Sequence, residues 1–186
     1  RIEPSQGFGT HGHKDMEIVT YIIEGALEHK DSMGNGSVIR RGDVQRMTAG
    51  TGVMHSEFNH SADVQTHLLQ IWLLPEESGL APGYEDRTFA EADKKNQLRL
   101  IVSRDARDGS LQINQDADVF ASVLETGALV THQLREGRGA WVQVIRGQVT
   151  LNSEKLDAGD GASVSESCEL EITALEEAEF LLFDMA

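Results

Sequence analysis

The sequence predicts an all-β protein built from two similar β-barrels in tandem. Helical periodicity is weak along the 186 residues, and the apolar residues either alternate or form short β-branched runs. Glycine and Asx turns, of which Asn35-Gly36 and Asp160-Gly161 are clear examples, separate these runs at short intervals. Many short strands with regular turns are typical of a β-sandwich or barrel. A weak internal repeat then favours two barrels.

Each apolar run predicts one strand. The runs cover residues 18–23, 38–39, 68–74, 98–102, 142–145 and 180–183. Residues 85–96 differ, because they are polar and carry the Ala and Glu spacing of one short helix. We interpret this segment as the connection between two halves. The resulting division is an N-terminal barrel over residues 1–95 and a C-terminal barrel over residues 96–186.

The internal repeat consists of an apolar strand, a glycine turn, a return strand and a Gly-Asp turn. Residues 21–27 (YIIEGAL) resemble residues 143–149 (QVIRGQV). The Gly-Asp turn follows as Gly42-Asp43 in the first copy and as Gly159-Asp160 in the second. Strand propensity alone can produce such echoes, but the shared order of turns favours a duplication.

The composition narrows the classes of partner and compartment. A formal net charge of −15 repels phosphates, so direct binding of nucleic acid is not expected, whereas a protein partner is compatible with it. No apolar run approaches the roughly 20 residues that span a bilayer, so no membrane association is expected. The single cysteine, Cys168, excludes an internal disulfide and fits the reducing cytoplasm. We expect Cys168 to be a buried strand residue.

Two pairs of metal-ligand residues carry the chemistry. His11 and His13 stand two residues apart, as do His55 and Glu57, and residues at this spacing share one face of a strand. With seven histidines in the chain, one His-x-His pair is a modest coincidence, but two such pairs beside glycine turns indicate a metal site. Three imidazoles and a carboxylate suit iron, nickel, copper, manganese or zinc, and the absence of a thiolate disfavours a closed structural zinc site.

The segments around these pairs resemble the two cupin motifs of the pirin family. Residues 6–17 (QGFGTHGHKDME) are similar to the first motif, and residues 49–59 (AGTGVMHSEFN) are similar to the second. The similarity continues at residues 104–111 (RDARDGSL). It implies two cupin barrels, with one divalent metal ion bound by His11, His13, His55 and Glu57. The expected ion is Fe(II), with nickel, manganese, copper and zinc as alternatives.

Pirin-like proteins carry some tens of residues ahead of the first motif. This chain starts at Arg1, only a few residues before the motif. We therefore expect a fragment of a longer protein, whose first barrel is incomplete.

The resemblance also implies an activity, that of an oxidoreductase of the quercetin 2,3-dioxygenase type. The substrate would be a small aromatic flavonol, whose 3-hydroxyl loses its proton on binding to the metal. Glu57 would accept that proton as the catalytic base. One alternative is a non-catalytic, redox-responsive regulatory protein that acts through a protein partner. Another is a different cupin reaction on an unknown small molecule.

The second repeat lacks the ligand set. Counting from the shared glycines places four other residues at the ligand positions: Gln133, Arg135, Ile172 and Ala174. His132 falls one residue off this alignment and has no expected partner. We therefore expect a C-terminal barrel without a metal.

Other polar side chains lie near the motifs. Glu17 is a ligand position in many other cupins, and here we expect it around the metal or at the surface. His29 and His67 lie in strands and are expected to be satisfied pocket or core histidines, while His60 lies in a polar turn and should be solvated. A further set could line a pocket, although core packing is the default expectation for each: Phe8, Met47, Gln70 and Trp72.

Overall fold

The computed structural model describes residues 1–166 and 169–186, so Cys168 lies outside the described residues. The chain folds as two compact units. The first comprises Arg1–Phe89 together with Leu111–Gln115, and the second comprises Ala90–Ser110 together with Asp116–Ala186. No helix in the described part of the chain is long and apolar enough to cross a membrane.

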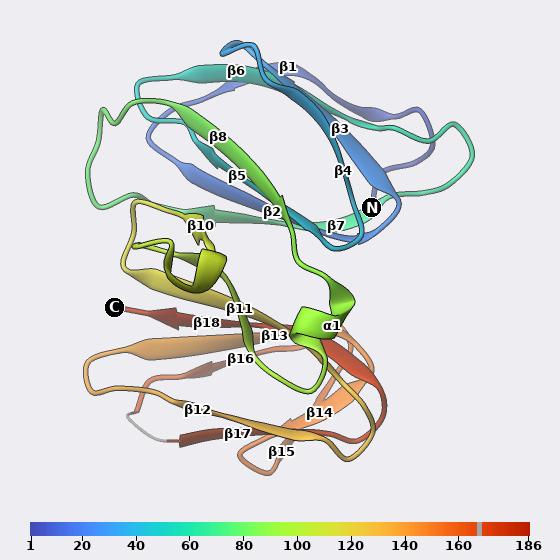
Figure 1. Cartoon of the computed structure of the whole chain (residues 1–186), viewed down its shortest axis with the longest axis vertical. Coiled ribbons are helices and arrows are strands. Elements are labelled where there is room, and N and C mark those ends of the chain that lie inside the picture. The colour runs from blue at the N-terminus through green and yellow to red at the C-terminus, as the bar shows by residue number, and fades with distance from the viewer. Residues whose placement is uncertain (167–168) are drawn as a thin grey trace. The chain divides into compact units, whose positions relative to one another are not determined.

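The first unit is built from two antiparallel sheets that face each other (Figure 1). One sheet has the strand order β1-β6-β3-β4, and the other has the order β7-β2-β5-β8. Buried apolar side chains fill the space between them, among them Ile18, Ile22 and Met47. The strands are β1 (Gly7–His13), β2 (Glu17–Glu24), β3 (Ala26–Asp31), β4 (Gly36–Arg40), β5 (Asp43–Thr48), β6 (Val53–Asn59), β7 (His67–Leu73) and β8 (Gly83–Thr88). The short strand β10 (Leu111–Gln112) belongs to the same unit.

The second unit repeats this two-sheet plan. One sheet has the order β12-β17-β14-β15, and the other contains β9, β11, β18, β13 and β16 as successive neighbours. Its core is apolar and includes Val142, Val144, Phe180 and Leu182. The strands are β9 (Arg99–Ser103), β11 (Ala117–Leu124), β12 (Leu129–Gln133), β13 (Gly139–Arg146), β14 (Gln148–Leu151), β15 (Glu154–Asp157), β16 (Gly161–Val164), β17 (Glu169–Ala174) and β18 (Ala178–Met185). The prediction of an all-β chain with two barrels is confirmed.

The repeated turns have the same structure in both units. Gly25 and Gly147 each join two strands with a positive φ, +79° and +69°, which favours glycine. In each Gly-Asp turn the aspartate caps the turn: Asp43 accepts a hydrogen bond from the backbone of Arg40, and Asp160 accepts one from Asp157, at 2.8 and 2.9 Å.

The segment expected to hold one helix divides into two elements. Its first residues complete β8, which pairs with β5, and only Glu91–Lys94 form the helix α1. A 3-10 turn follows at Arg107–Gly109. The prediction of one short helix within residues 85–96 is confirmed at Glu91–Lys94, while residues 85–88 are polar because β8 is an edge strand with outward side chains.

Candidate metal centre

The predicted ligands lie on two neighbouring strands of the first unit. On β6 the buried residues alternate with exposed ones, so that His55 and Glu57 point inward while Met54 and Phe58 point outward. On β1 His11 is the direct cross-strand partner of His55, and the register shifts between Phe8 and His11. This irregularity sets His11 opposite His55.

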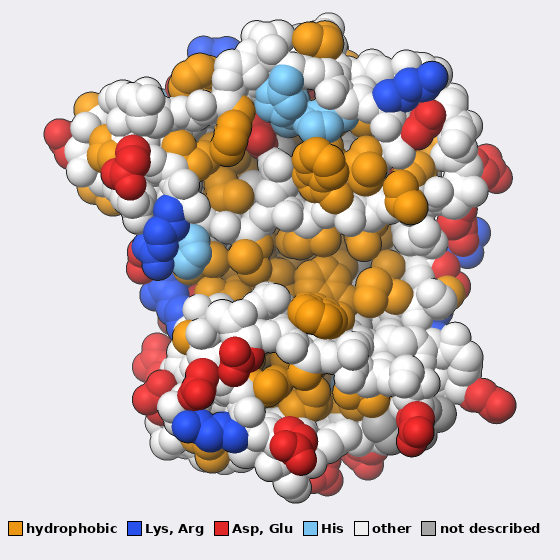
Figure 2. Space-filling model, turned by 180° about the vertical axis from the view of Figure 1, so that it is seen from behind, with side chains coloured by type: hydrophobic (Ala, Val, Ile, Leu, Met, Phe, Trp, Pro, Cys, Tyr) orange, Lys and Arg blue, Asp and Glu red, His pale blue; other side chains and the backbone are white. Residues whose placement is uncertain are grey.

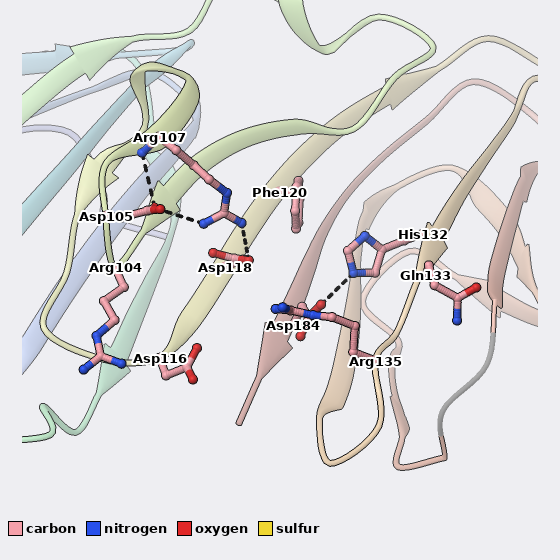
Figure 3. Close-up of a pocket in the computed structure, with 10 residues that line it drawn as sticks. All are labelled: Arg104, Asp105, Arg107, Asp116, Asp118, Phe120, His132, Gln133, Arg135 and Asp184. Carbon is pink, nitrogen blue, oxygen red and sulfur yellow. Dashed lines mark hydrogen bonds and ion pairs between the residues drawn. The ribbon is translucent and has the colours of Figure 1, made fainter.

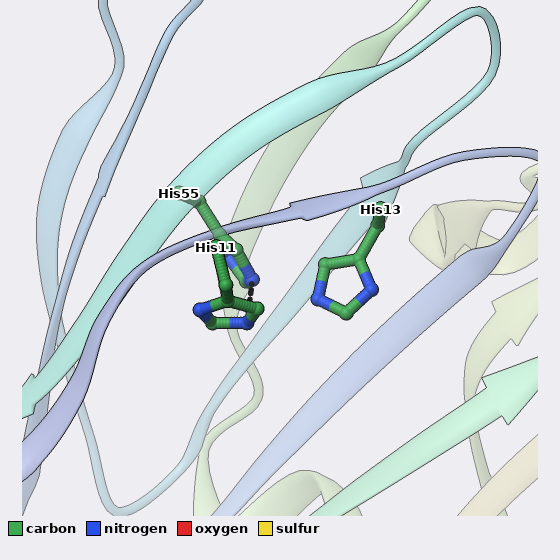
Figure 4. Close-up of side chains that lie close together, drawn as sticks. All are labelled: His11, His13 and His55. Carbon is green, nitrogen blue, oxygen red and sulfur yellow. Dashed lines mark hydrogen bonds between the residues drawn. The ribbon is translucent and has the colours of Figure 1, made fainter.

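Three imidazoles converge at this point (Figure 4). The Nε2 atoms of His11 and His55 lie 3.0 Å apart, and the ring of His13 lies 4.9 Å from each of the other two ring centres. One ligand atom from each of the three falls within 4.8 Å of the others. Two nitrogens bound to one ion at about 2.1 Å and at right angles would lie roughly 3 Å apart, so the His11–His55 spacing fits adjacent positions on an octahedral ion.

The protonation states also suit a cation. Nδ1 of His11 lies 2.8 Å from the carbonyl of Gly9, so its hydrogen is committed there and the Nε2 lone pair faces the cluster. Burial, followed by the neighbouring histidines, lowers the pKa of His55 to about 4. Burial and His11 lower the pKa of His13 as well. The neutral imidazoles favoured in this way are the form that binds metal.

Glu57 belongs to a second triad, in which His55 is shared. The ligand atoms of His29, His55 and Glu57 lie within 4.8 Å of one another, and all three residues are buried. The Nδ1 atom of His55 is buried without a hydrogen-bond partner among the described residues. The structure thus groups His11 and His13 with His55, and it groups Glu57 with His55 and His29.

His29 is held by the protein through both ring nitrogens. Nε2 lies 3.2 Å from a carboxylate oxygen of Asp31, and Nδ1 lies 3.5 Å from the amide nitrogen of Gln45. The ring also stacks on Tyr84 at 4.8 Å, and burial raises the pKa of that phenol. His29 is therefore a satisfied pocket histidine, as its place on an inward strand face predicted. The partnership with Tyr84 had no signal in the sequence, because β3 and β8 belong to different sheets that no local pattern brings together.

Gln70 orients Glu57. Its Nε2 lies 3.2 and 2.9 Å from the two carboxylate oxygens, and its Oε1 accepts a hydrogen bond from the indole of Trp72 at 3.3 Å. Trp72 in turn makes an edge contact with His13 at 5.1 Å. The expectation of core packing is wrong for Trp72 and Phe8, whose exposed fractions are 54% and 56%, and correct for Met47.

Glu17 is a buried structural carboxylate. It accepts hydrogen bonds from Thr48 at 2.9 Å and from Asn114 at 2.8 Å, and it is fully buried. A surface position for Glu17 is therefore wrong. His60 is about half exposed and lies 3.3 Å from Glu28, in agreement with a solvated turn position. His67 begins β7 and is partly buried.

Strand register corrects the alignment of the second repeat. Leu27 pairs with Asn59 in the first unit, and the equivalent Val149 pairs with Ala174 in the second. Leu170 and Ile172 therefore stand at the positions of His55 and Glu57. His132 pairs with Leu170 as His11 pairs with His55, so His132 is the counterpart of His11.

His132 also has a partner, contrary to expectation. Its Nε2 lies 2.7 Å from a carboxylate oxygen of Asp184. The count from the glycines failed because the intervening segments differ in length. His11 precedes Gly25 by 14 residues and His132 precedes Gly147 by 15, whereas His55 follows Gly42 by 13 and Leu170 follows Gly159 by 11.

Two family models match the chain in succession. The Pirin model matches residues 1–73, and the model described as the quercetinase C-terminal cupin domain matches residues 100–185. A relative from Escherichia coli (strain K12), named quercetin 2,3-dioxygenase, is 46% identical over 184 residues, which span 99% of this chain and 78% of the relative. The chain belongs to the pirin family.

Solved pirin structures share the fold closely. The crystal structure of YhhW from Escherichia coli is 45% identical, with a TM-score of 0.95 over 100% of this chain and 78% of that one. A structure of bacterial pirin YhhW in complex with nickel(II), also 45% identical, has a TM-score of 0.93 over 99% of this chain and 78% of that one. The resemblance to pirins seen in the two motifs is confirmed, and with it the cupin architecture.

Proposed function

We propose that this pirin is a metal-dependent dioxygenase that opens the central ring of a quercetin-like flavonol with O2. His11, His13, His55 and Glu57 would hold one divalent cation in the N-terminal barrel, and the C-terminal barrel would hold none. The observation that carries the proposal is the 3.0 Å approach of the His11 and His55 nitrogens, with His13 beside them. The name of the Escherichia coli relative supports the substrate class.

The donor set fits such an ion but does not select one. Neutral imidazoles and a carboxylate bind iron, nickel, copper, manganese and zinc in the general order of their affinities. We propose Fe(II) as the physiological ion, while the nickel complex of YhhW supports a site that accepts other ions as well. When bound, the ion supplies Lewis acidity that favours the ionised flavonol, and it supplies the redox chemistry toward O2.

Glu57 would serve as the base for the flavonol 3-hydroxyl. Its carboxylate is buried and lies next to the histidine cluster, and the two hydrogen bonds from Gln70 fix its plane. A base of this kind must lie within hydrogen-bond reach of the proton that it accepts. By holding both oxygens, Gln70 would keep Glu57 in position while the proton moves.

Exposed apolar side chains beside the histidines would receive the aromatic rings. Trp72 contacts His13, and Phe8 lies on the same strand as His11, and both are more than half exposed. Figure 2 shows histidine side chains that reach one face of the molecule next to hydrophobic side chains. An amphipathic, planar ligand suits such a border between polar and apolar groups.

The experiment compares the chain with three variants in metal content, quercetin consumption and carbon monoxide release. His11→Ala should lose the metal, and with it all turnover. Glu57→Gln should lower turnover by roughly 100-fold or more, because the variant lacks the base for the flavonol 3-hydroxyl. His60→Ala is the matched control, because this histidine is half exposed and its ring lies beside Glu28, outside the histidine cluster.

Two results would contradict the proposal. If His11→Ala binds as much metal as the parent chain, the site lies elsewhere. If the parent chain holds about one metal ion and consumes no quercetin, the dioxygenase is excluded, and regulation through a protein partner becomes the function to test.

A further inference from the structure

The second unit contains a polar cavity of about 470 Å³ at the position that corresponds to the metal centre of the first. His132, the counterpart of His11, forms part of its wall, together with Asp118, Phe120, Arg135 and Asp184 (Figure 3). Its volume lies in the range of small-molecule sites, about 300 to 1,000 Å³. The interior positions below it are apolar, since Leu170 and Ile172 replace the ligands.

Each of the four carboxylates of this cavity has an arginine partner: Asp105 shares Arg107 with Asp118, and Asp116 shares Arg138 with Asp184. Asp118 and Asp184 are buried and face each other directly across β11 and β18, an arrangement that is unfavourable for like charges. Arg107 forms an ion pair with Asp118, and Arg138 forms one with Asp184. The acidic side chains therefore have little affinity left for a cation, and the cavity is not a displaced metal site.

His132 completes a fixed wall. One carboxylate oxygen of Asp184 accepts a hydrogen bond from Arg138. The other oxygen lies 2.7 Å from Nε2 of His132. The other face of the imidazole lies beside Phe120, with 5.1 Å between the ring centres. Phe120 is only partly buried and lines the cavity, so an aromatic surface is available next to the charged groups.

Arg135 supplies a guanidinium that the protein does not use. It follows β12, is exposed, and its side chain makes no ion pair or hydrogen bond with any residue in the described ranges 1–166 and 169–186. Arg104, which follows β9, also lines the cavity. A cavity lined by both a guanidinium and an aromatic ring is suited to a planar aromatic anion, because the guanidinium can bind a carboxylate through two parallel hydrogen bonds.

We propose that the cavity of the second unit is a binding site for a small aromatic carboxylate. The carboxylate pairs with Arg135, and the ring packs against Phe120 and His132. This binding does not depend on the dioxygenase activity. The cavity residues all belong to the second unit, whereas the histidine cluster belongs to the first.

Calorimetric titration of the metal-loaded full chain tests this site with 4-hydroxybenzoate as the probe. Binding of 4-hydroxybenzoate is expected, with much weaker binding of acetate, which lacks the ring, and of 4-hydroxybenzamide, which lacks the charge. Arg135→Gln should weaken 4-hydroxybenzoate roughly 10-fold or more, since a charge-assisted hydrogen bond is lost. Arg87→Gln, at an exposed arginine of the first unit, is the control and should bind as the parent chain does.

His11→Ala separates this site from the metal centre. The proposal requires that His11→Ala retain the affinity for 4-hydroxybenzoate, because the probe should not contact the histidine cluster. Equal affinities for the parent chain and Arg135→Gln would overturn it. So would binding that is lost in His11→Ala, or binding of acetate as tight as that of 4-hydroxybenzoate.

Discussion

Gln70 and Glu57 connect the two sheets of the first unit through their side chains. Glu57 lies on β6 and Gln70 on β7, strands of different sheets, yet the amide of Gln70 reaches both oxygens of the carboxylate. Glu57, the proposed base and metal ligand, is therefore oriented by Gln70 from the facing sheet. Groups that orient a metal ligand in this way commonly matter nearly as much as the ligand itself.

Replacing Gln70 with Ala should weaken metal binding roughly 10-fold to 100-fold without unfolding the chain. Glu57 would keep its charge but lose both hydrogen bonds that fix its plane. Metal retained after dialysis against a graded series of chelator concentrations measures the effect. Gln65→Ala, at a partly buried glutamine that contacts Arg1 and not the cluster, should retain metal as the parent chain does. Equal retention in Gln70→Ala would show that Gln70 does not support the site.

The sequence predicted the histidine cluster but not its support. His11, His13, His55 and Glu57 could be paired because residues two apart on a strand share a face, which is a local rule. The contacts from Gln70 to Glu57 and from His29 to Tyr84 join distant strands, and no local pattern reveals which strands will face each other.

The same limit explains the misaligned second repeat. Counting from a shared glycine assumes intervening segments of equal length, whereas His55 follows Gly42 by 13 residues and its counterpart Leu170 follows Gly159 by 11. Register along the paired strands, which only the structure supplies, identified His132 as the counterpart of His11. Its partner Asp184 lies 52 residues away, on β18.

The metal-free chain should lose stability as the pH falls from about 6.5 to about 4. His55 has a folded pKa near 4, below the ordinary value of 6.5, because it is buried among other histidines. In this window the unfolded chain binds a proton that the folded chain does not, so acid favours unfolding. The lowered pKa of His13 acts in the same direction.

Thermal melting of the metal-free chain at a series of pH values measures this dependence. His55→Gln should flatten the slope between pH 6.5 and 4, with a residual slope from His13. His60→Ala should melt with the slope of the parent chain. A slope unchanged in His55→Gln would mean that other groups cause the acid sensitivity.

Gly147→Ala should destabilise the second unit far more than Gly127→Ala. Both glycines have a positive φ, +69° and +80°, so both variants incur the cost of that backbone conformation, about 1 to 2 kcal/mol. Only at Gly147 would the new methyl also collide with backbone, since it would lie 2.1 Å from the carbonyl oxygen of Glu177. At Gly127 no atom of the described residues would lie within 4 Å of the methyl. The collision should add roughly 1 to 3 kcal/mol.

Urea unfolding measures the free energy of unfolding of the two glycine variants, provided that the fluorescence signal comes from the second unit alone. The chain has two tryptophans, Trp72 in the first unit and Trp141 in the second, so a Trp72→Phe background leaves Trp141 as the reporter. Equal losses of stability for the two glycine variants would contradict the close approach at Gly147.

Arg138→Met should cost the second unit about 3 to 5 kcal/mol of stability. The Arg138 side chain is 9% exposed and pairs with Asp184, whose side chain is 3% exposed. Its removal leaves a buried carboxylate whose remaining side-chain partner, among the described residues, is His132. Asp118, which faces Asp184 across the sheet, adds repulsion that Arg138 no longer offsets.

Lys95→Met is the control, because the Lys95–Glu125 pair is solvent-exposed on both sides and should contribute little. The Trp141 signal in urea reports both variants. A loss for Arg138→Met as small as that for Lys95→Met would mean that Asp184 takes up a proton or finds another partner, and partial recovery of Arg138→Met at low pH would identify the proton.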